Sequence, residues 1–493
     1  AGFIDFNKKS NFYILKEMTD VLHHRGPDDS GYSFYENEYA NVGLGHRRLS
    51  IIDLSTHGHQ PMKFQNLEIV YNGEVYNFKE IRNELEKYGY KFESNSDTEV
   101  ILKAYYHWGV KAIDKFIGMF AIAIYDKKEQ KLTLIRDRAG VKPLYYYFKN
   151  GLFMFASELK SFHKHPDFQK EINIDALAIF FQFSYILQPY TIFQNTYKLP
   201  AGHYAEIDLK NQAFKVQKYW DVIDFYNRPK LNITFEEAKS ETEKLLKSAC
   251  EYRMVADVPV GIFLSGGYDS TAVTAMLQKD RSKKLKTFSI GFYEEKYNEA
   301  HYAKKAAEYL GTDHTEYYCT QEDAQELLPH LSEIWDEPFG DPSVIPTTLV
   351  SRIARQSVKV SLSADGGDEI FGGYDKYTSA LKYKKLFHKL PLRRLIALLM
   401  DNVSPTYLLG LNKTYNFTNR YEKLKTLLEA NDIIQVMNNL VYFFSYKDTV
   451  RLLGRSFELK TNFDDVNILN SAYNDDIDRM MVIDYKTYLV DDI

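Results

Sequence analysis

The residues GIFLSGGYDSTAV, from Gly261 to Val273, join a short apolar run to a segment with a helical pattern through Ser-Gly-Gly. The same rhythm of strand, loop and helix continues further along the chain. We expect strands at 259–264, 287–291 and 358–362 and helices at 271–278 and 300–310. Because strands that alternate with helices form parallel sheets covered on both faces, this half of the chain predicts an α/β domain.

The Ser-Gly-Gly loop follows the carboxyl end of the first of these strands, where parallel sheets bind their ligands. Glycines let backbone N–H groups approach a ligand, and the start of the next helix attracts phosphate oxygens. Ser265 and Ser270 add hydroxyl donors, and Asp269 makes sense beside phosphate chiefly as a ligand for Mg²⁺. The alternative is a plain glycine turn in which Asp269 is the helix N-cap.

A second loop, LSADGGDEIFGGY from Leu362 to Tyr374, follows the strand expected at 358–362. Asp365, Asp368 and Glu369 crowd around its glycines, and such carboxylates repel one another unless they share a cation or a proton. The chain has neither a P-loop nor a G-x-G-x-x-G fingerprint. We therefore predict that the two loops hold Mg²⁺-ATP between them, with Ser-Gly-Gly-x-Asp-Ser on the pyrophosphate that leaves when ATP is split to AMP.

The amino-terminal half has a different texture, in which strands outnumber helices. We expect strands at 67–75, 119–125, 131–135, 144–148 and 152–156 and helices at 78–88 and 98–108. This pattern predicts an α+β domain of sheets covered by helices. A chain of 493 residues is too long for one core, and we divide it into a domain at 1–208, a connector at 209–232 and a domain at 233–493.

Composition excludes several classes of function. A net charge of −5 gives no electrostatic reason to bind nucleic acid. The longest apolar stretch, 176–187, contains Gln182 and Ser184 and is shorter than the ~20 residues of a membrane span. Cys250 and Cys319 have no disulfide or metal spacing and are expected to be buried hydrophobes in a reducing cytoplasm.

The two loops together resemble those of the glutamine-dependent asparagine synthetase family. The amino-terminal half independently resembles a class II glutaminase domain, in the motifs HHRGPD (23–28), GHRRLSIID (45–53), YNGEVYN (71–77), SDTE (96–99), RDRAGVKPLYY (136–146) and ASELK (156–160). The motifs occur in order over nearly the whole chain. The resemblance implies stacked antiparallel sheets in a domain that hydrolyses glutamine, and a second domain that activates a carboxylate with ATP and receives ammonia internally.

In the first domain the resemblance gives roles to particular residues. Arg48 is expected to bind the glutamine carboxylate and Asp97 its α-ammonium group, with Glu74 also in the glutamine site. Asn72 and the N–H of Gly73 are expected to form the oxyanion hole. The alternative for Asn72-Gly73 is a hairpin turn, for which Asn-Gly is a strong signal. His23 and His24 are interpreted as structural supports, and not as a base or metal ligands.

In the second domain the resemblance places pyrophosphate, metal, adenosine and a catalytic acid. Asp365 is expected near the acyl-adenylate, where it accepts a proton from the attacking amine. The expected pyrophosphate-binding residues are Ser265, Gly266, Gly267, Asp269 and Ser270, the Mg²⁺ ligands Asp269 and Asp368, and the adenosine-binding residues Leu264, Ser289, Ile290, Ser363 and Ala364.

The chain departs from the family pattern in three places. Family members begin Met-Cys-Gly-Ile-x-Gly-Phe with the Cys as nucleophile, whereas this sequence opens Ala1-Gly2-Phe3. We interpret that as truncation or disorder, and expect no glutamine hydrolysis by the chain as written. The final DYKTYLVDDI resembles the start of a longer family segment. Tyr268 stands where Leu or Ile is common, and Ala364 replaces a usual Gly.

The sequence thus predicts ATP- and Mg²⁺-dependent amidation of aspartate to asparagine, with glutamine as nitrogen donor and AMP and pyrophosphate as products. Two alternatives are a relative that amidates another carboxylate, such as a sugar uronic acid, and a non-catalytic nucleotide-binding remnant. We expect the segment WDEPFGDPSVIPTT (335–348) to wall the acceptor pocket. A homodimer would be unsurprising for the family.

Overall fold

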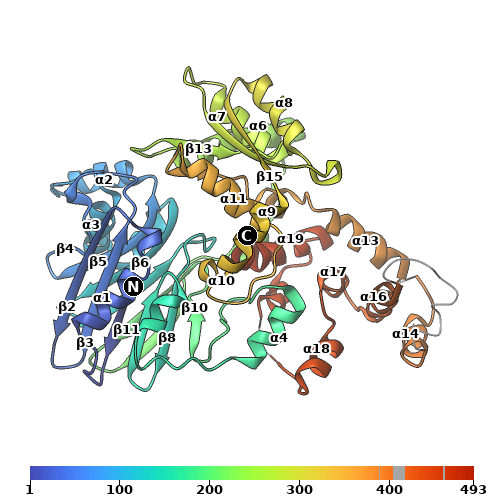
Figure 1. Ribbon diagram of the computed structural model, residues 1–493, viewed down its shortest axis with the longest axis horizontal. Helices are drawn as coiled ribbons and strands as arrows, with labels where there is room; N and C mark the ends of the chain where they lie inside the picture. Colours follow the sequence, from blue (N-terminus) through green and yellow to red (C-terminus); the bar gives the residue numbers. More distant parts are fainter. Residues whose placement is uncertain (388, 404–416, 459–460) are drawn as a thin grey trace.

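The computed structural model describes residues 1–387, 389–403, 417–458 and 461–493. Within these residues, the amino-terminal part contains two antiparallel sheets, and the carboxyl-terminal part contains one parallel sheet followed by a group of helices (Figure 1). The expected fold class is confirmed for both parts of the chain.

Two six-stranded sheets form the amino-terminal part. The first has the order β10-β8-β9-β1-β3-β2, with β1 Gly2–Asp5, β2 Asp29–Glu36, β3 Asn41–Arg48, β8 Tyr145–Lys149, β9 Leu152–Ala156 and β10 Thr196–Lys198. The second has the order β12-β11-β7-β6-β5-β4, with β4 Met62–Phe64, β5 Leu67–Val75, β6 Gly118–Asp126, β7 Lys131–Arg136, β11 His203–Asp208 and β12 Ala213–Lys218. Neighbouring strands in both sheets run antiparallel.

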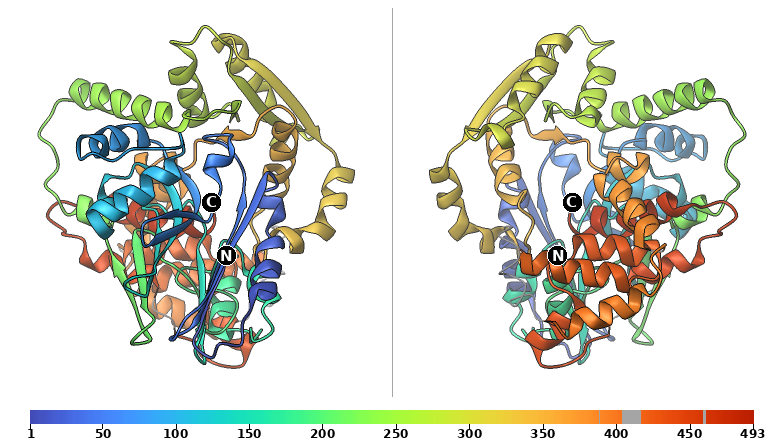
Figure 2. Two further views of the ribbon diagram at one scale, coloured as in Figure 1. Left: turned by 90° about the vertical axis from the view of Figure 1, so that its left-hand side faces the viewer. Right: turned by 90° about the vertical axis from the view of Figure 1, so that its right-hand side faces the viewer.

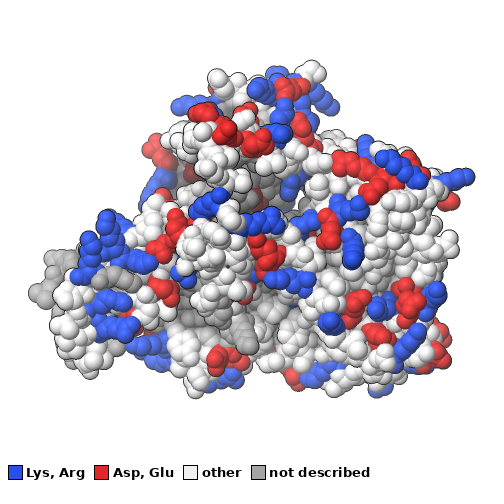
Figure 3. Space-filling model, turned by 180° about the vertical axis from the view of Figure 1, so that it is seen from behind, with Lys and Arg blue, Asp and Glu red and all other residues white. Residues whose placement is uncertain are grey.

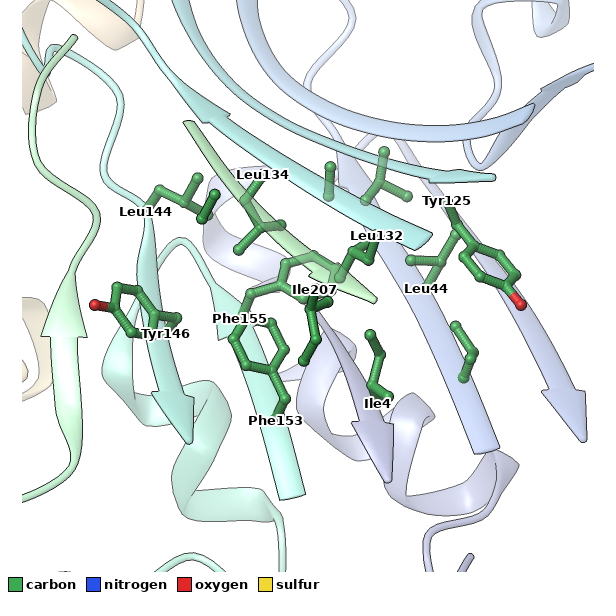
Figure 4. Packing of buried hydrophobic residues seen from close by; sticks show 14 of the residues in the cluster. Ile4, Leu44, Tyr125, Leu132, Leu134, Leu144, Tyr146, Phe153, Phe155 and Ile207 are labelled. Atoms are coloured by element: carbon green, nitrogen blue, oxygen red, sulfur yellow. The ribbon is translucent and has the colours of Figure 1, made fainter. Parts of the chain in front are cut away.

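The two sheets pack face to face around a shared apolar core. Figure 4 shows Ile4, Leu44 and Phe153 from the first sheet against Leu132 and Ile207 from the second. Alternation along β5 explains the layering, because successive side chains of a strand point to opposite faces. Val70 joins the core between the sheets, whereas Ile69 and Tyr71 pack under α2 (Phe78–Lys87) and α3 (Asp97–Trp108).

One predicted boundary needs correction. Residues 213–218, assigned to the connector, form β12 and pair along their length with β11. Phe214 and Val216 pack against the core, but exposed lysines and a glutamine alternate with them. Because an edge strand buries only part of its surface, its pattern is weak in the sequence. The second sheet therefore extends beyond residue 208.

The carboxyl-terminal part begins with a four-stranded parallel sheet of order β15-β14-β13-β16. Its strands are β13 Val260–Phe263, β14 Lys286–Phe292, β15 Asp313–Cys319 and β16 Val360–Leu362. On one face lie α6 (Phe235–Arg253), α7 (Tyr268–Gln278) and α8 (Ala300–Leu310), which cover Ile262 and Leu264. On the other lies α11 (Val344–Arg355), which covers Phe288. Helices on both faces agree with the prediction.

Helices complete the described structure. Those after the parallel sheet gather on one side of the molecule (Figure 2, right) around a second apolar core that includes Tyr377, Met437 and Met480. They are α12 Gly367–Phe371, α13 Asp375–Phe387, α14 Arg393–Asp401, α16 Phe417–Glu429, α17 Ile433–Val441, α18 Tyr446–Leu453, α19 Asp476–Lys486 and α20 Tyr488–Asp491. The shorter elements elsewhere are α1 Phe12–Asp20, α4 Ile174–Phe183, α5 Ile223–Tyr226, α9 Gln321–Leu327 and α10 Leu331–Ile334.

The surface agrees with the balanced composition. On the face shown in Figure 3, basic and acidic side chains are interspersed. Among the described helices, none combines the length and the apolar character that a membrane crossing requires. Cys250 and Cys319 are both buried free thiols.

Candidate functional site

Asn72 and Gly73 lie inside a strand. They belong to β5 and pair with Ala121 and Phe120 of β6, so the hairpin-turn alternative is wrong. Gly73 has a φ of 149°, and a Cβ at this position would lie 2.1 Å from the carbonyl oxygen of Met119. Only glycine fits this close approach of two backbones. The bulk of a side chain is therefore excluded next to Asn72.

Asn72 also contributes to a small cavity between the two antiparallel sheets. The cavity has a volume of about 40 Å³ and is lined from both sheets, by Gly45 and His46 of β3 as well as Asn72. The Nδ2 of Asn72 and the Nδ1 of His46 are buried there without a hydrogen-bond partner in the described residues. Since one water needs ~10–15 Å³, the cavity has room for a small polar molecule.

Two carboxylates are buried beside this strand. Asp97 accepts hydrogen bonds from the hydroxyl of Tyr71 at 2.8 Å and from the N–H of Val75 at 3.0 Å. Burial raises the pKa of Asp97. Burial and the charge of Asp97 raise the pKa of Glu74 to about 8, and Oε1 of Glu74 has no partner among the described residues. Two neighbouring buried acids, one with an unpartnered oxygen, suit a ligand that brings an ammonium group.

Arg48 is buried at the end of β3 and holds the loop that follows it. Its guanidinium donates to the carbonyl oxygens of Ser55 at 2.8 Å, Ile52 at 3.4 Å and Asp53. Asp53 in turn accepts from the N–H of Asn95 at 2.8 Å, two residues before Asp97. The structure thus links the expected carboxylate-binding and ammonium-binding residues through Asp53, which the sequence analysis did not single out.

The histidines of the HHRGPD motif contact other side chains of the first domain. His24 and Arg25 both bond Glu158 of the ASELK motif, Arg25 at 2.7 Å, and His23 bonds Arg47. Burial raises the pKa of Glu158, but the contacts with His24, Arg25 and Lys160 outweigh it and lower the pKa to about 2. The arrangement fits a supporting role for the motif.

The Ser-Gly-Gly loop, which the sequence predicts to bind pyrophosphate, connects β13 to α7. Gly267 is the N-cap of α7, and no side chain caps this helix; the alternative that Asp269 is the N-cap is wrong, because Asp269 lies within the first turn. The hydroxyls of Ser265 and Ser270 are 3.0 Å apart, and the N–H of Gly267 donates to Ser265 at 3.3 Å. Uncapped first-turn N–H groups remain for an anion.

The second loop meets the first because β16 lies directly beside β13. A Cβ on Gly367 would lie 2.6 Å from Oδ2 of Asp269, so the Asp269 carboxylate lies against the second loop. Burial and the charge of Asp269 raise the pKa of Asp368. Glu369 points elsewhere and accepts the hydroxyl of Tyr374 at 2.7 Å, and Asp365 is exposed and bonded by Ser363.

A Mg²⁺ ion fits the pair of carboxylates formed by Asp269 and Asp368. The charge of Asp269 makes Asp368 costlier to ionise, and a divalent cation that also binds phosphate oxygens would remove that cost. Among the described residues no cluster of three or more potential metal ligands is present. Asp269 and Asp368 would therefore hold the ion together with the nucleotide.

The expected adenosine-binding residues lie at one level of the parallel sheet. The register pairs Phe263 with Phe288 and Ile262 with Leu362. The same register, continued past the ends of β13 and β16, places Leu264 and Ala364 beside Ser289 of β14, with Ser363 and Ile290 next to them along the chain. Leu264 is fully buried, and the hydroxyl of Ser289 lies 3.2 Å from Nε2 of His314.

Comparison with known proteins identifies the family to which the chain belongs. A model described as a glutamine amidotransferase domain matches residues 1–220, and a model described as asparagine synthase matches residues 241–493. The chain belongs to the asparagine synthetase family. Members of this family are glutamine-dependent ligases that form an amide at the expense of ATP, and the two sites described above occur in the two matched regions.

Three relatives show the range of the family. The chain is 42% identical over 413 residues to putative asparagine synthetase (glutamine-hydrolyzing) 2 of Methanocaldococcus jannaschii, covering 79% of this chain and 78% of that protein. It is 34% identical over 495 residues to asparagine synthetase (glutamine-hydrolyzing) 1 of Bacillus subtilis, covering 97% and 73%. It is also 32% identical over 385 residues to amidase chry2 of Gibberella zeae, covering 74% and 55%.

Only part of the segment 335–348 lines a cavity, because two of its acidic residues contact the amino-terminal part of the chain. Asp336 accepts from the N–H of Lys160 at 2.7 Å, and Glu337 pairs with Lys198 at 3.3 Å, so both acids contact the amino-terminal part. Gly340, Asp341 and Pro342 instead line a cavity of about 350 Å³. Its other walls include the charged residues Lys376, Asp484 and Asp492, the polar residues Ser184, Asn438 and Thr487, and the aromatic residues Phe183, Tyr185, Tyr374, Phe443, Phe463 and Tyr488.

Proposed function

We propose that this protein makes asparagine from aspartate, with glutamine as nitrogen donor and ATP converted to AMP and pyrophosphate. The observation that carries the proposal is the meeting of Asp269 and Asp368 at the carboxyl ends of two adjacent parallel strands, in one chain with a site formed by the buried Glu74 and Asp97 and the buried Nδ2 of Asn72. One site suits Mg²⁺-pyrophosphate, and the other suits an amino acid. Neither site by itself accounts for an amide-forming reaction.

In the first step, glutamine is bound through its two charged ends. Arg48 binds its carboxylate, and Asp97 with Glu74 binds its α-ammonium group. Asn72 Nδ2 and the N–H of Gly73 donate to the amide oxygen as negative charge develops there. Hydrolysis gives glutamate and ammonia.

In the second site, a carboxylate oxygen of the acceptor attacks the α-phosphorus of ATP and pyrophosphate leaves. Ser265, Gly266, Gly267 and Ser270 bind the departing pyrophosphate, and Asp269 and Asp368 would hold a Mg²⁺ ion that would offset its charge. The nitrogen of ammonia then attacks the acyl carbon, AMP leaves, and the proton released passes to Asp365.

The cavity of about 350 Å³ supports aspartate as acceptor. Aspartate carries an α-carboxylate and an α-ammonium group, and the cavity offers the ammonium of Lys376 and the carboxylate of Asp341. It borders the second loop, because Tyr374 at the end of that loop lines it. A group left unpaired there would cost roughly 1–3 kcal/mol, so selection between acceptors should be strong.

A uronic acid is the second candidate, and the aromatic walls favour it. Phe183, Tyr185 and Tyr488 offer flat apolar faces on which a sugar ring can pack. Recognition would then depend on the sugar hydroxyls and not on an α-ammonium group.

Pyrophosphate release by the full-length enzyme with ammonia and Mg²⁺-ATP separates these possibilities. We expect release at millimolar aspartate, with asparagine formed in equal amount. Release with a nucleotide-linked uronic acid and none with aspartate would contradict the acceptor assignment. Release with neither, despite ATP binding, would support a non-catalytic nucleotide-binding protein.

The remaining expectations follow the family resemblance. We propose a glutaminase part and a synthetase part joined by a connector that starts after β12 (Ala213–Lys218), cytoplasmic location, a homodimer and no nucleic-acid partner. Light scattering tests the oligomeric state.

A further inference from the structure

The residues 50–55, which we call the 50–55 loop, join the two parts of the chain through Asp257. The N–H of Asp257 donates to the carbonyl oxygen of Ile51 at 2.9 Å, and the N–H of Asp53 donates back to Oδ2 of Asp257 at 2.8 Å. Asp257 lies three residues before β13 (Val260–Phe263). The loop is therefore bonded to the entrance of the strand that ends at the Ser-Gly-Gly loop.

A second contact reaches the neighbouring strand. Nζ of Lys359 donates to Oδ2 of Asp28 at 2.8 Å, and the same oxygen accepts from the N–H of Ser50 at 2.8 Å. Burial would raise the pKa of Asp28, but these hydrogen bonds and the charge of Lys359 outweigh it and lower the pKa. Lys359 directly precedes β16 (Val360–Leu362), which ends at the second loop.

The other side of the 50–55 loop faces the glutamine site. Arg48 donates to the carbonyl oxygens of Ile52, Asp53 and Ser55, and the Asp53 carboxylate accepts from the N–H of Asn95. Asp53 is thus bonded to both sides, to the residues expected to bind glutamine and to Asp257.

The backbone conformation of Asp53 makes the 50–55 loop depend on the contacts around it. Asp53 has a φ of 54°, in the left-handed region that residues other than glycine rarely adopt. Such a conformation persists only while surrounding contacts hold it. Those contacts come from Arg48, Asn95, Ser55 and Asp257. The 50–55 loop is therefore well ordered only when these four residues are held in place, and the reverse also applies.

We propose that Asp257 is a positioning residue through which occupancy of the glutamine site tightens ATP binding, and the reverse. This rests on the proposed roles of Arg48 and Asp97. A ligand that neutralises those two side chains orders the 50–55 loop and fixes the Asp53 N–H toward Asp257. The residues that lead into β13 are then ordered before ATP binds, so ATP binding costs less conformational entropy.

Calorimetric titration of the enzyme tests the coupling without any acceptor. L-glutamate serves as the probe, because it has the α-carboxylate and α-ammonium group but no amide to hydrolyse. We expect saturating glutamate to lower the Kd of Mg²⁺-ATP about fivefold, near the low end of typical coupling. ATP must lower the Kd of glutamate by the same factor, because coupling between binding sites is reciprocal.

Three variants identify the contact. Asp257→Ala removes the acceptor for the Asp53 N–H from an exposed position and should bring both ratios to one, with the Kd of ATP alone unchanged. Asp257→Asn keeps a side-chain oxygen and should retain most of the effect. Arg455→Gln breaks a different contact between the two parts, with Asp175 of α4, and should retain all of it.

Equal Kd values for ATP with and without glutamate in the wild-type enzyme would overturn the proposal. So would a coupling that survives Asp257→Ala, or one that Arg455→Gln also abolishes. The proposed acceptor chemistry is tested separately, by pyrophosphate release with ammonia and aspartate. Its failure would not affect the two binding measurements, since neither of them uses an acceptor.

Discussion

Replacement of Glu74 by Gln should make the pH dependence of stability less steep. Glu74 is 4% exposed, and burial together with the charge of Asp97 raises its pKa from the usual 4.5 to about 8. In the folded protein Glu74 keeps its proton up to that pH, whereas in the unfolded chain it loses it near pH 4.5. The unfolded state therefore binds fewer protons in this window, and stability falls as pH rises.

The magnitude follows from the width of that window. The slope is about 1.4 kcal/mol per pH unit, so the wild type should lose about 3 kcal/mol relative to Glu74→Gln between pH 5 and pH 7.5. The amide itself carries an unpaired NH₂ that costs roughly 1–3 kcal/mol, but that cost does not change with pH. The difference in slope is thus a cleaner signature than the absolute stability.

Thermal unfolding of both proteins at several pH values from 5 to 8 gives the test. For a domain of this size about 3 kcal/mol corresponds to a shift of roughly 6–12 °C in the difference between the two Tm values. Glu86→Gln, at an exposed position of α2, controls for the loss of a surface carboxylate. Parallel pH profiles for wild type and Glu74→Gln would refute the reasoning. Glutamine binding should weaken in the same variant, because a partner of the α-ammonium group is lost.

Three further predictions test other parts of the structure. Asn72→Ala should lower glutamine-dependent turnover of the full-length enzyme by ~10²–10³ and spare the ammonia-dependent reaction, and equal loss of both would contradict the two-site assignment. Asp269→Asn and Asp368→Asn should each impair ATP–pyrophosphate exchange while glutamine hydrolysis continues, because an amide lacks the charge that Mg²⁺ requires; exchange that survives both would remove the metal assignment. Lys198→Met should destabilise the protein by about 3–5 kcal/mol in urea unfolding at pH 7, since Glu337 and Asp491 then lack their buried cation, and an unchanged midpoint would show that the pairs contribute nothing.

Local patterns in the sequence were sufficient for most of the secondary structure. The strands at 67–75 and 152–156 have the predicted bounds, and the helix at 300–310 does as well. These segments have strong periodicity, because one face or both faces are buried. The strand at 213–218 was missed, since an edge strand with exposed lysines resembles a polar connector.

Some local alternatives could be decided only in three dimensions. Asn72-Gly73 has the sequence of a hairpin turn, yet it lies inside β5, where Met119 leaves no room for a Cβ beside Asn72. Asp269 could have been an N-cap, but the chain turns into the helix at Gly267. In both cases a dipeptide has several allowed conformations, and packing against a distant segment selects one.

The sequence by itself determined the family, the two glycine-rich acidic loops and the residue types in both candidate sites, because these depend on short motifs whose spacing is fixed along the chain. Tertiary structure alone decided which charges meet. Asp269 lies against the second loop, Glu337 is paired with Lys198, and Asp53 is bonded to Asp257, across separations of 98, 139 and 204 residues. No local pattern records such pairs, since each depends on how sheets and helices pack.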